Sequence, residues 1–123
     1  NYDFDVKLKL IGHSESVTIV DAVKIDDKIL VVSSSNDKTS CIWENDKQIA
    51  KISFDNFIFD TKIISNSIFS NILIAFGGAD EVITLYQLNN LNQVDLLIKL
   101  KGHEDWILTI DITFQNGKIK NQF

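Results

Sequence analysis

The chain has 123 residues, of which 45% are hydrophobic and 24% charged, a composition typical of one small folded domain rather than a disordered segment. The formal net charge is −5 and all 12 cationic residues are lysines, which argues against direct binding to a nucleic-acid backbone. The single cysteine, Cys41, excludes an internal disulfide, and no apolar run approaches the roughly 18 residues that a membrane span needs.

Alternating apolar and polar residues predict β-strands along most of the chain. The first alternating run covers residues 4 to 10 and carries its charges on one side. Shorter runs follow, bounded by the Asn, Asp, Gly and Ser residues that turns favour: 25–34, 39–44, 71–78 and 81–87. Alternation returns at 94–101 and again at 106–114. This pattern predicts an all-β protein, and a helix over residues 88 to 100 is the only serious alternative.

The chain also repeats itself over a longer distance. The segments LKLIGHSESVTIVD (8–21) and IKLKGHEDWILTID (98–111) match almost column for column, and their glycines, Gly12 and Gly102, are 90 residues apart. The segment SSSNDKTSCIWE (33–44) matches AFGGADEVITLYQ (75–87), with 43 residues from Asp37 to Asp80. The same spacing separates Trp43 from Tyr86. A period of about 43 to 45 residues with four short strands is that of a propeller blade.

These residues resemble a WD repeat, with Gly12-His13 at the start of the first unit and Trp43-Glu44 at its end. The resemblance implies an all-β WD-repeat β-propeller fragment made of four-stranded antiparallel blades. The expected parts are an outer strand of a preceding blade (about 4–11), a blade at about 12–54, a blade at about 55–101 and the start of a third at about 102–123. Because two blades and part of a third cannot close a propeller, we expect the chain to be an excerpt of a longer protein.

By position, the resemblance assigns a hydrogen-bonded network to His13, Ser33, Asp37 and Trp43. Their donor and acceptor chemistry fits, because an indole N–H can only donate whereas serine and neutral imidazole can do both. The repeat-equivalent structural residues are Gly12, Asp80, Tyr86, Gly102 and His103. In the second unit Phe54-Asp55 stands where Gly-His would be and Ala75 where the serine would be, so apolar packing is expected to replace the network there.

Two chemical alternatives compete with this structural role. A Ser-His-Asp set could form a hydrolase triad, but no G-x-S-x-G motif accompanies it. The run His103-Glu104-Asp105 could bind a metal, but the two histidines fall in different units and Cys41 is near neither. We therefore expect no catalytic residue, metal or cofactor. Glu104, Asp105 and Trp106 are instead expected on the propeller rim, as candidate contacts for a partner.

The order of the motifs resembles a more particular family, the WD-repeat second subunits of the Elongator complex. The resemblance rests on SSSNDKTSCIW, a unit without Gly-His, ILIAFGGADEVITLYQL and GHEDWI. It implies a non-catalytic scaffold in a complex that modifies wobble uridines of tRNA. The implied partners are neighbouring blades of the same full-length chain and other Elongator subunits, with tRNA reached only indirectly and with no membrane or small-molecule substrate. The implied location is cytoplasmic with a nuclear alternative, and a WD-repeat adaptor of another complex is the alternative function.

Overall fold

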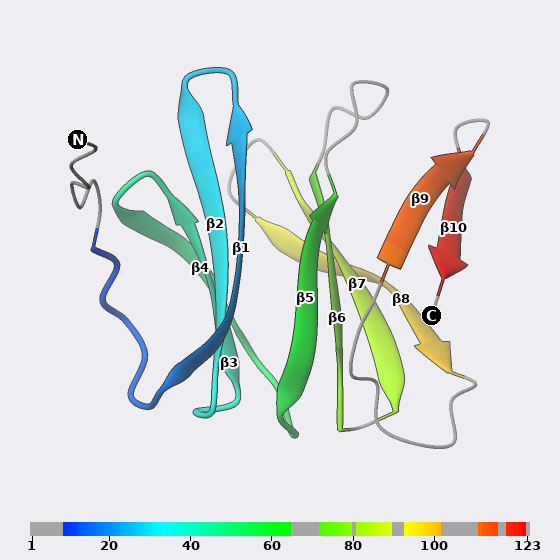
Figure 1. The fold of residues 1–123 in the computed structure, drawn as a ribbon, viewed down its shortest axis with the longest axis horizontal. Helices are drawn as coiled ribbons and strands as arrows, with labels where there is room; N and C mark the ends of the chain where they lie inside the picture. The colour runs from blue at the N-terminus through cyan, green and yellow to red at the C-terminus, as the bar shows by residue number, and fades with distance from the viewer. Residues whose placement is uncertain are drawn as a thin grey trace, which may run out of the picture.

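The computed structural model describes residues 9–64, 72–79, 81–89, 93–101, 111–115 and 118–122, the last two ranges by their backbone alone. Two four-stranded antiparallel sheets account for most of these residues, and Figure 1 shows them side by side. The first sheet contains β1 (Val17–Ile25), β2 (Lys28–Ser35), β3 (Thr39–Glu44) and β4 (Lys47–Ser53). The second contains β5 (Ile58–Ile64), β6 (Ile72–Gly78), β7 (Val82–Leu88) and β8 (Val94–Lys101). A hairpin of β9 (Asp111–Gln115) and β10 (Lys118–Gln122) follows.

The predicted all-β class is confirmed in the described part of the chain. Each sheet is a meander in which every strand pairs with the next one along the chain. The helical alternative for residues 88–100 is wrong where the structure describes them, since β8 begins at Val94 and pairs with β7. Among the described residues, no helix is long and apolar enough to cross a membrane.

The two sheets are built to the same plan. Ser16 O accepts a hydrogen bond from Asn36 N at 3.0 Å in the first sheet, and Phe57 O accepts one from Ala79 N at 3.0 Å in the second. The following turns each contain a non-glycine residue with positive φ: Lys38 at 65° and Glu81 at 64°. The pairings of β1 with β2 and of β5 with β6 also carry a register shift at the same place.

This common plan gives a residue-by-residue correspondence. Residues in and before β1 correspond to residues 41 positions later, as Val17 does to Ile58. Residues of β2 and β3 correspond to residues 43 positions later, as Trp43 does to Tyr86. The difference arises because the second sheet has two more residues between equivalent positions of its first two strands: Val17 and its partner Ser35 are 18 positions apart, whereas Ile58 and its partner Gly78 are 20 apart.

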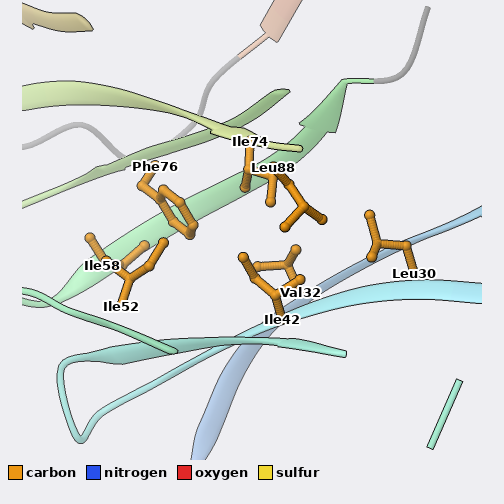
Figure 2. Close-up of a cluster of buried hydrophobic side chains, with 8 residues drawn as sticks. All are labelled: Leu30, Val32, Ile42, Ile52, Ile58, Ile74, Phe76 and Leu88. Atoms are coloured by element: carbon orange, nitrogen blue, oxygen red, sulfur yellow. The ribbon is translucent and has the colours of Figure 1, made fainter. Parts of the chain in front are cut away.

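The main hydrophobic core lies between the facing surfaces of the two sheets. Figure 2 shows eight buried side chains that point toward one another from both sides. The first sheet contributes Leu30, Val32, Ile42 and Ile52, and the second contributes Ile58, Ile74, Phe76 and Leu88. On the far side of the second sheet, Ile64, Leu73, Ala75, Ile83 and Leu85 form another apolar cluster. Burial on both surfaces explains why the central strands β2 and β6 are almost continuously apolar or small.

Polar contacts also join the two sheets. The Asp21 carboxylate on β1 accepts a hydrogen bond from the backbone N–H of Ile63 on β5, with 2.7 Å between Oδ2 and N. The hydroxyl of Ser34 lies 2.6 Å from that of Ser40 and 2.9 Å from that of Thr61. These three hydroxyl groups are buried, so their mutual hydrogen bonds offset the cost of removing them from water.

Gly78 allows the loop that enters the second sheet to approach β6 closely. A Cβ atom at this position would lie 2.1 Å from the carbonyl oxygen of Phe57, which is a backbone atom and cannot rotate away. We therefore expect Gly78→Ala to lower the free energy of unfolding by about 1–3 kcal/mol, as overpacking does elsewhere. Urea unfolding of the purified protein measures this, with the exposed-site substitution Ser53→Ala as the control. A change no larger than the control's would contradict the close approach.

Candidate functional site

The strongest polar cluster lies on the side of the first sheet that faces away from the second. Residues 12–16 pass over this surface and place His13 between the β2–β3 turn and the middle of β2. His13 Nδ1 is 3.0 Å from Asp37 Oδ2, and His13 Nε2 is 2.8 Å from Ser33 Oγ. Trp43 Nε1 on β3 donates to the same Ser33 oxygen at 2.9 Å. The structure thus brings all four residues of the predicted network together.

The chemistry of the partners determines how protons are arranged in this network. An ionised Asp37 carboxylate can only accept, so Nδ1 of His13 carries the hydrogen of that contact. The indole N–H of Trp43 occupies one lone pair of Ser33, whose own hydroxyl hydrogen can then be donated to Nε2 of His13. The resulting donor order is Trp43 to Ser33 to His13 to Asp37, and every group in it has a partner. The network ties residue 13 to three different parts of the sheet.

Asp37 is the most heavily hydrogen-bonded residue of the cluster. Besides His13, its carboxylate accepts hydrogen bonds from Ser14 N at 3.0 Å, from Thr39 N at 2.9 Å and from the Thr39 hydroxyl. Burial acts to raise the pKa of Asp37, but these hydrogen bonds together outweigh burial and hold the pKa well below its usual range. Thr39 Oγ1 is also 3.2 Å from His13 Nδ1, so this threonine belongs to the network although the sequence analysis did not include it.

The lowered pKa of Asp37 predicts a definite pH dependence of stability. A carboxylate with a depressed folded-state pKa contributes stability that is fully present above its unfolded pKa of about 3.9 and is lost as the pH falls below it. We expect the stability difference between wild type and Asp37→Asn to be largest above about pH 5 and to shrink below about pH 4. Urea unfolding at a series of pH values measures the difference. A stability difference between wild type and Asp37→Asn that stays constant down to pH 3 would show that the network does not favour the ionised form of the Asp37 side chain.

Gly12 is required by the indole of Trp43. A Cβ atom at Gly12 would lie 2.9 Å from Trp43 Cη2 and 2.8 Å from Gln48 Oε1. The glutamine can move, but the ring is held by packing and by its bond to Ser33. The Gly-His pair therefore has one structural explanation: the glycine lets the chain cross the tryptophan, and the histidine then reaches the serine.

The three consecutive serines of β2 serve three different purposes. Ser33 belongs to the histidine network, and Ser34, on the opposite side of the sheet, joins the buried hydroxyl cluster with Thr61. The Ser35 hydroxyl donates to Glu15 O at 3.1 Å and accepts from Asp37 N at 3.1 Å, which fixes the loop before β1. In the sequence, the roles of Ser34 and Ser35 are indicated only by the run of three serines in a strand that is otherwise apolar.

The contacts of Asp37, His13 and Ser33 follow the order of a hydrolase triad, so their surroundings decide what they can do. Ser33 is only 6% exposed and its oxygen already accepts the indole N–H of Trp43. The side chains of His13 and Asp37 are 4% and 7% exposed. A nucleophile must be accessible to a substrate carbonyl, whereas this serine is enclosed in the sheet. The arrangement is therefore suited to holding the loop, not to acyl transfer.

An aromatic cluster takes the place of the network in the second sheet. The correspondence pairs His13 with Phe54, Ser33 with Phe76 and Trp43 with Tyr86. The Phe54 and Phe76 rings are 5.0 Å apart, and Phe76 meets Tyr86 edge-on at 5.6 Å with an interplanar angle of 82°. Edge-to-face contacts of this kind contribute more stability than the buried apolar area alone would give.

This correspondence corrects two predictions. Phe76, not Ala75, occupies the serine position, and Ser53-Phe54, not Phe54-Asp55, occupies the Gly-His position. Tyr86 occupies the position equivalent to that of Trp43, as the 43-residue spacing predicted. Apolar side chains do pack in place of the network. Ile74 and Phe76 belong to the main core and Ile63 and Ile72 pack against it, as expected of these residues, whereas Phe57, which was expected to join them, is 42% exposed and takes no part in the main core.

Several predicted residues lie outside the part of the chain that the structure describes. They are Asp80, Gly102, His103, Glu104, Asp105 and Trp106. Within the described residues, no group of three or more His, Cys, Asp or Glu side chains could hold a metal ion. Cys41 is buried in β3, and this burial raises the pKa of its thiol.

The two equivalent sheets and their structural clusters define a β-sheet repeat protein. No family model matches the chain. The chain is similar to Elongator complex protein 2 of Danio rerio, with 30% identity over 115 residues that cover 88% of this chain. It is also similar to Elongator complex protein 2 of Dictyostelium discoideum (29% identity, 96% of this chain) and of Arabidopsis thaliana (25% identity, 92% of this chain). The chain spans 14%, 16% and 15% of the lengths of these three relatives.

Proposed function

We propose that this chain forms blades of a WD-repeat β-propeller and acts as a non-catalytic scaffold of an Elongator-type complex. In this proposal residues 12–54 and 55–101 are two blades, residues 102–123 begin a third, and residues 4–11 supply the outer strand of a preceding one. Neighbouring blades of the full-length chain and other subunits of the complex are its partners. The observation that carries the proposal is the similarity to Elongator complex protein 2 over 88–96% of the chain in three distant organisms.

The geometry supports the scaffold part of the proposal independently of these similarities. His13 and Asp37 have side chains of a kind that can act in catalysis, but here their hydrogen bonds hold a loop against the first sheet. In the second sheet the equivalent positions are occupied by aromatic rings. Because aromatic packing in the second sheet takes the place of the hydrogen-bonded network of the first, we infer that the network stabilises the repeat and does not support a reaction. The proposed role is therefore to present loops to partners.

An Elongator-type complex modifies wobble uridines of tRNA, and we assign this chain a supporting role in which it meets tRNA only through other subunits. The absence of arginine and the net charge of −5 support this indirect role. Glu104, Asp105 and Trp106 are the proposed rim contacts, and the proposed location is the cytoplasm with the nucleus as a second compartment.

Affinity purification of the native protein followed by mass spectrometry tests the proposal. Recovery of the other Elongator subunits in stoichiometric amounts is the expected result. A different stable set of partners would keep the scaffold role and reject the Elongator assignment. Turnover by the purified protein alone, abolished by Ser33→Ala with the fold intact, would overturn the non-catalytic role.

A further inference from the structure

The loops at one end of the two sheets form a connected surface. They are residues 14–16, 36–38, 55–57, 79 and 81, hereafter the loop end, and Figure 1 shows the described loops together at the lower end of the sheets. Backbone hydrogen bonds join them in series: Asn36 N to Ser16 O, Phe54 N to Lys38 O at 2.9 Å, and Ala79 N to Phe57 O. A surface held by backbone contacts presents its side chains in fixed positions, which lowers the entropy cost of binding.

Phe57 is the aromatic residue of the loop end, and the fold does not require it there. The residue is 42% exposed, and it does not belong to either buried apolar cluster. The equivalent position in the first sheet is Ser16, which shows that the same loop forms with a small polar side chain. The close approach of the Phe57 carbonyl to Gly78 fixes the backbone beneath the ring. A large apolar side chain that is exposed, rigidly held and structurally dispensable is suited to contacting a partner.

The charges around Phe57 define what kind of partner fits. Glu15, Asp55 and Glu81 are exposed acidic residues of the loop end. Lys38 is the lysine among the described residues of the loop end, and it lies over the Phe57 ring with its Nζ 5.3 Å from the ring centroid. The ring therefore already accepts a cation at its face, and the acidic residues complement a basic chain.

From these observations we propose that the loop end docks a basic polypeptide segment that places an apolar side chain on Phe57. The inference rests on the proposed scaffold role and specifies the chemistry of one partner. Phe57 supplies the apolar contact, and Asp55 and Glu81 supply the charge attraction. An acidic segment or a second copy of this chain would be repelled by the same carboxylates.

Fluorescence anisotropy of the purified full-length protein with a labelled decapeptide of alternating arginine and leucine tests this inference. Phe57→Ser, which installs the residue found at the equivalent position of the first sheet, should weaken binding about tenfold, as loss of an interface anchor does. Reversing the charges with Asp55→Lys and Glu81→Lys should also weaken it and flatten its salt dependence. Ile29→Ser is the matched control, because Ile29 is 38% exposed and outside the loop end, and it should leave binding unchanged.

Any of the following results would overturn the inference. One is equal binding by wild type and Phe57→Ser, with unchanged melting temperatures. Another is tighter binding of a peptide in which glutamate replaces arginine. The third is concentration-dependent self-association in ultracentrifugation that Phe57→Ser abolishes, since the occupant would then be a second copy. Suppose that Phe57→Ser co-purifies with the Elongator subunits as wild type does and also binds the peptide as tightly as wild type does. This docking site would then be rejected, while the scaffold role would stand.

Discussion

Replacing Phe76 with alanine should lower the free energy of unfolding by about 3–5 kcal/mol, the range observed for buried phenylalanines. Phe76 is fully buried between the two sheets and touches both Phe54 and Tyr86. The substitution removes the central ring of the cluster and leaves a cavity at the interface. Urea unfolding of the purified protein, followed by tryptophan fluorescence, measures the loss.

Phe57→Ala is the matched control for this experiment. It deletes the same side chain at a position that is 42% exposed, so we expect a loss below about 1 kcal/mol. A double-mutant cycle with Tyr86→Leu should give a coupling energy of about 0.5–1.5 kcal/mol for the edge-to-face pair. Equal losses for Phe76→Ala and Phe57→Ala would mean that the aromatic cluster does not hold the sheets together.

Replacing Asp37 with alanine should cost about 1.5–3 kcal/mol at neutral pH, the range for losing hydrogen bonds to a charged group. The substitution leaves donors on His13, Ser14 and Thr39 without their acceptor in a nearly enclosed site. The loop of residues 12–16 is then no longer fixed to the β2–β3 turn. Hydrogen exchange at Ser14 N–H should accelerate together with the loss of stability.

Asp37→Asn is the conservative comparison, because its amide oxygen can still accept part of these hydrogen bonds. We expect a smaller loss than for alanine, and a smaller one again for Thr39→Val, which removes a single hydroxyl. If all three variants unfold at the same urea concentration as wild type, the cluster contributes nothing to stability.

Much of the fold could be read from the sequence. Alternation predicted strands because a residue period of two places apolar side chains on one surface of a sheet. The spacing of 43 residues from Trp43 to Tyr86 predicted that these side chains occupy equivalent places, and the register of β3 and β7 agrees. His13, Ser33, Asp37 and Trp43 were identified together because their residue types and order resemble a known repeat.

The two errors in the second unit have one physical cause. Pairing Phe54-Asp55 with Gly12-His13, and Ala75 with Ser33, both assume a shift of 42 residues. The structure has shifts of 41 before the first hairpin connection and 43 after it, because the second sheet has two more residues between equivalent positions of its first two strands. Loop lengths vary at little cost to the sheets they join, so no single period aligns both halves of a repeat.

The strand class and the repeat follow from the sequence, because they depend on local alternation and on residue types at fixed separations, and the members of the histidine network follow from the resemblance to a WD repeat. Which residues meet across the two sheets is visible only in the folded structure. Asp21 with Ile63 and Ser34 with Thr61 are 42 and 27 positions apart. Their proximity follows from how two sheets pack face to face, and that packing is fixed by the combined burial of both surfaces rather than by any local pattern.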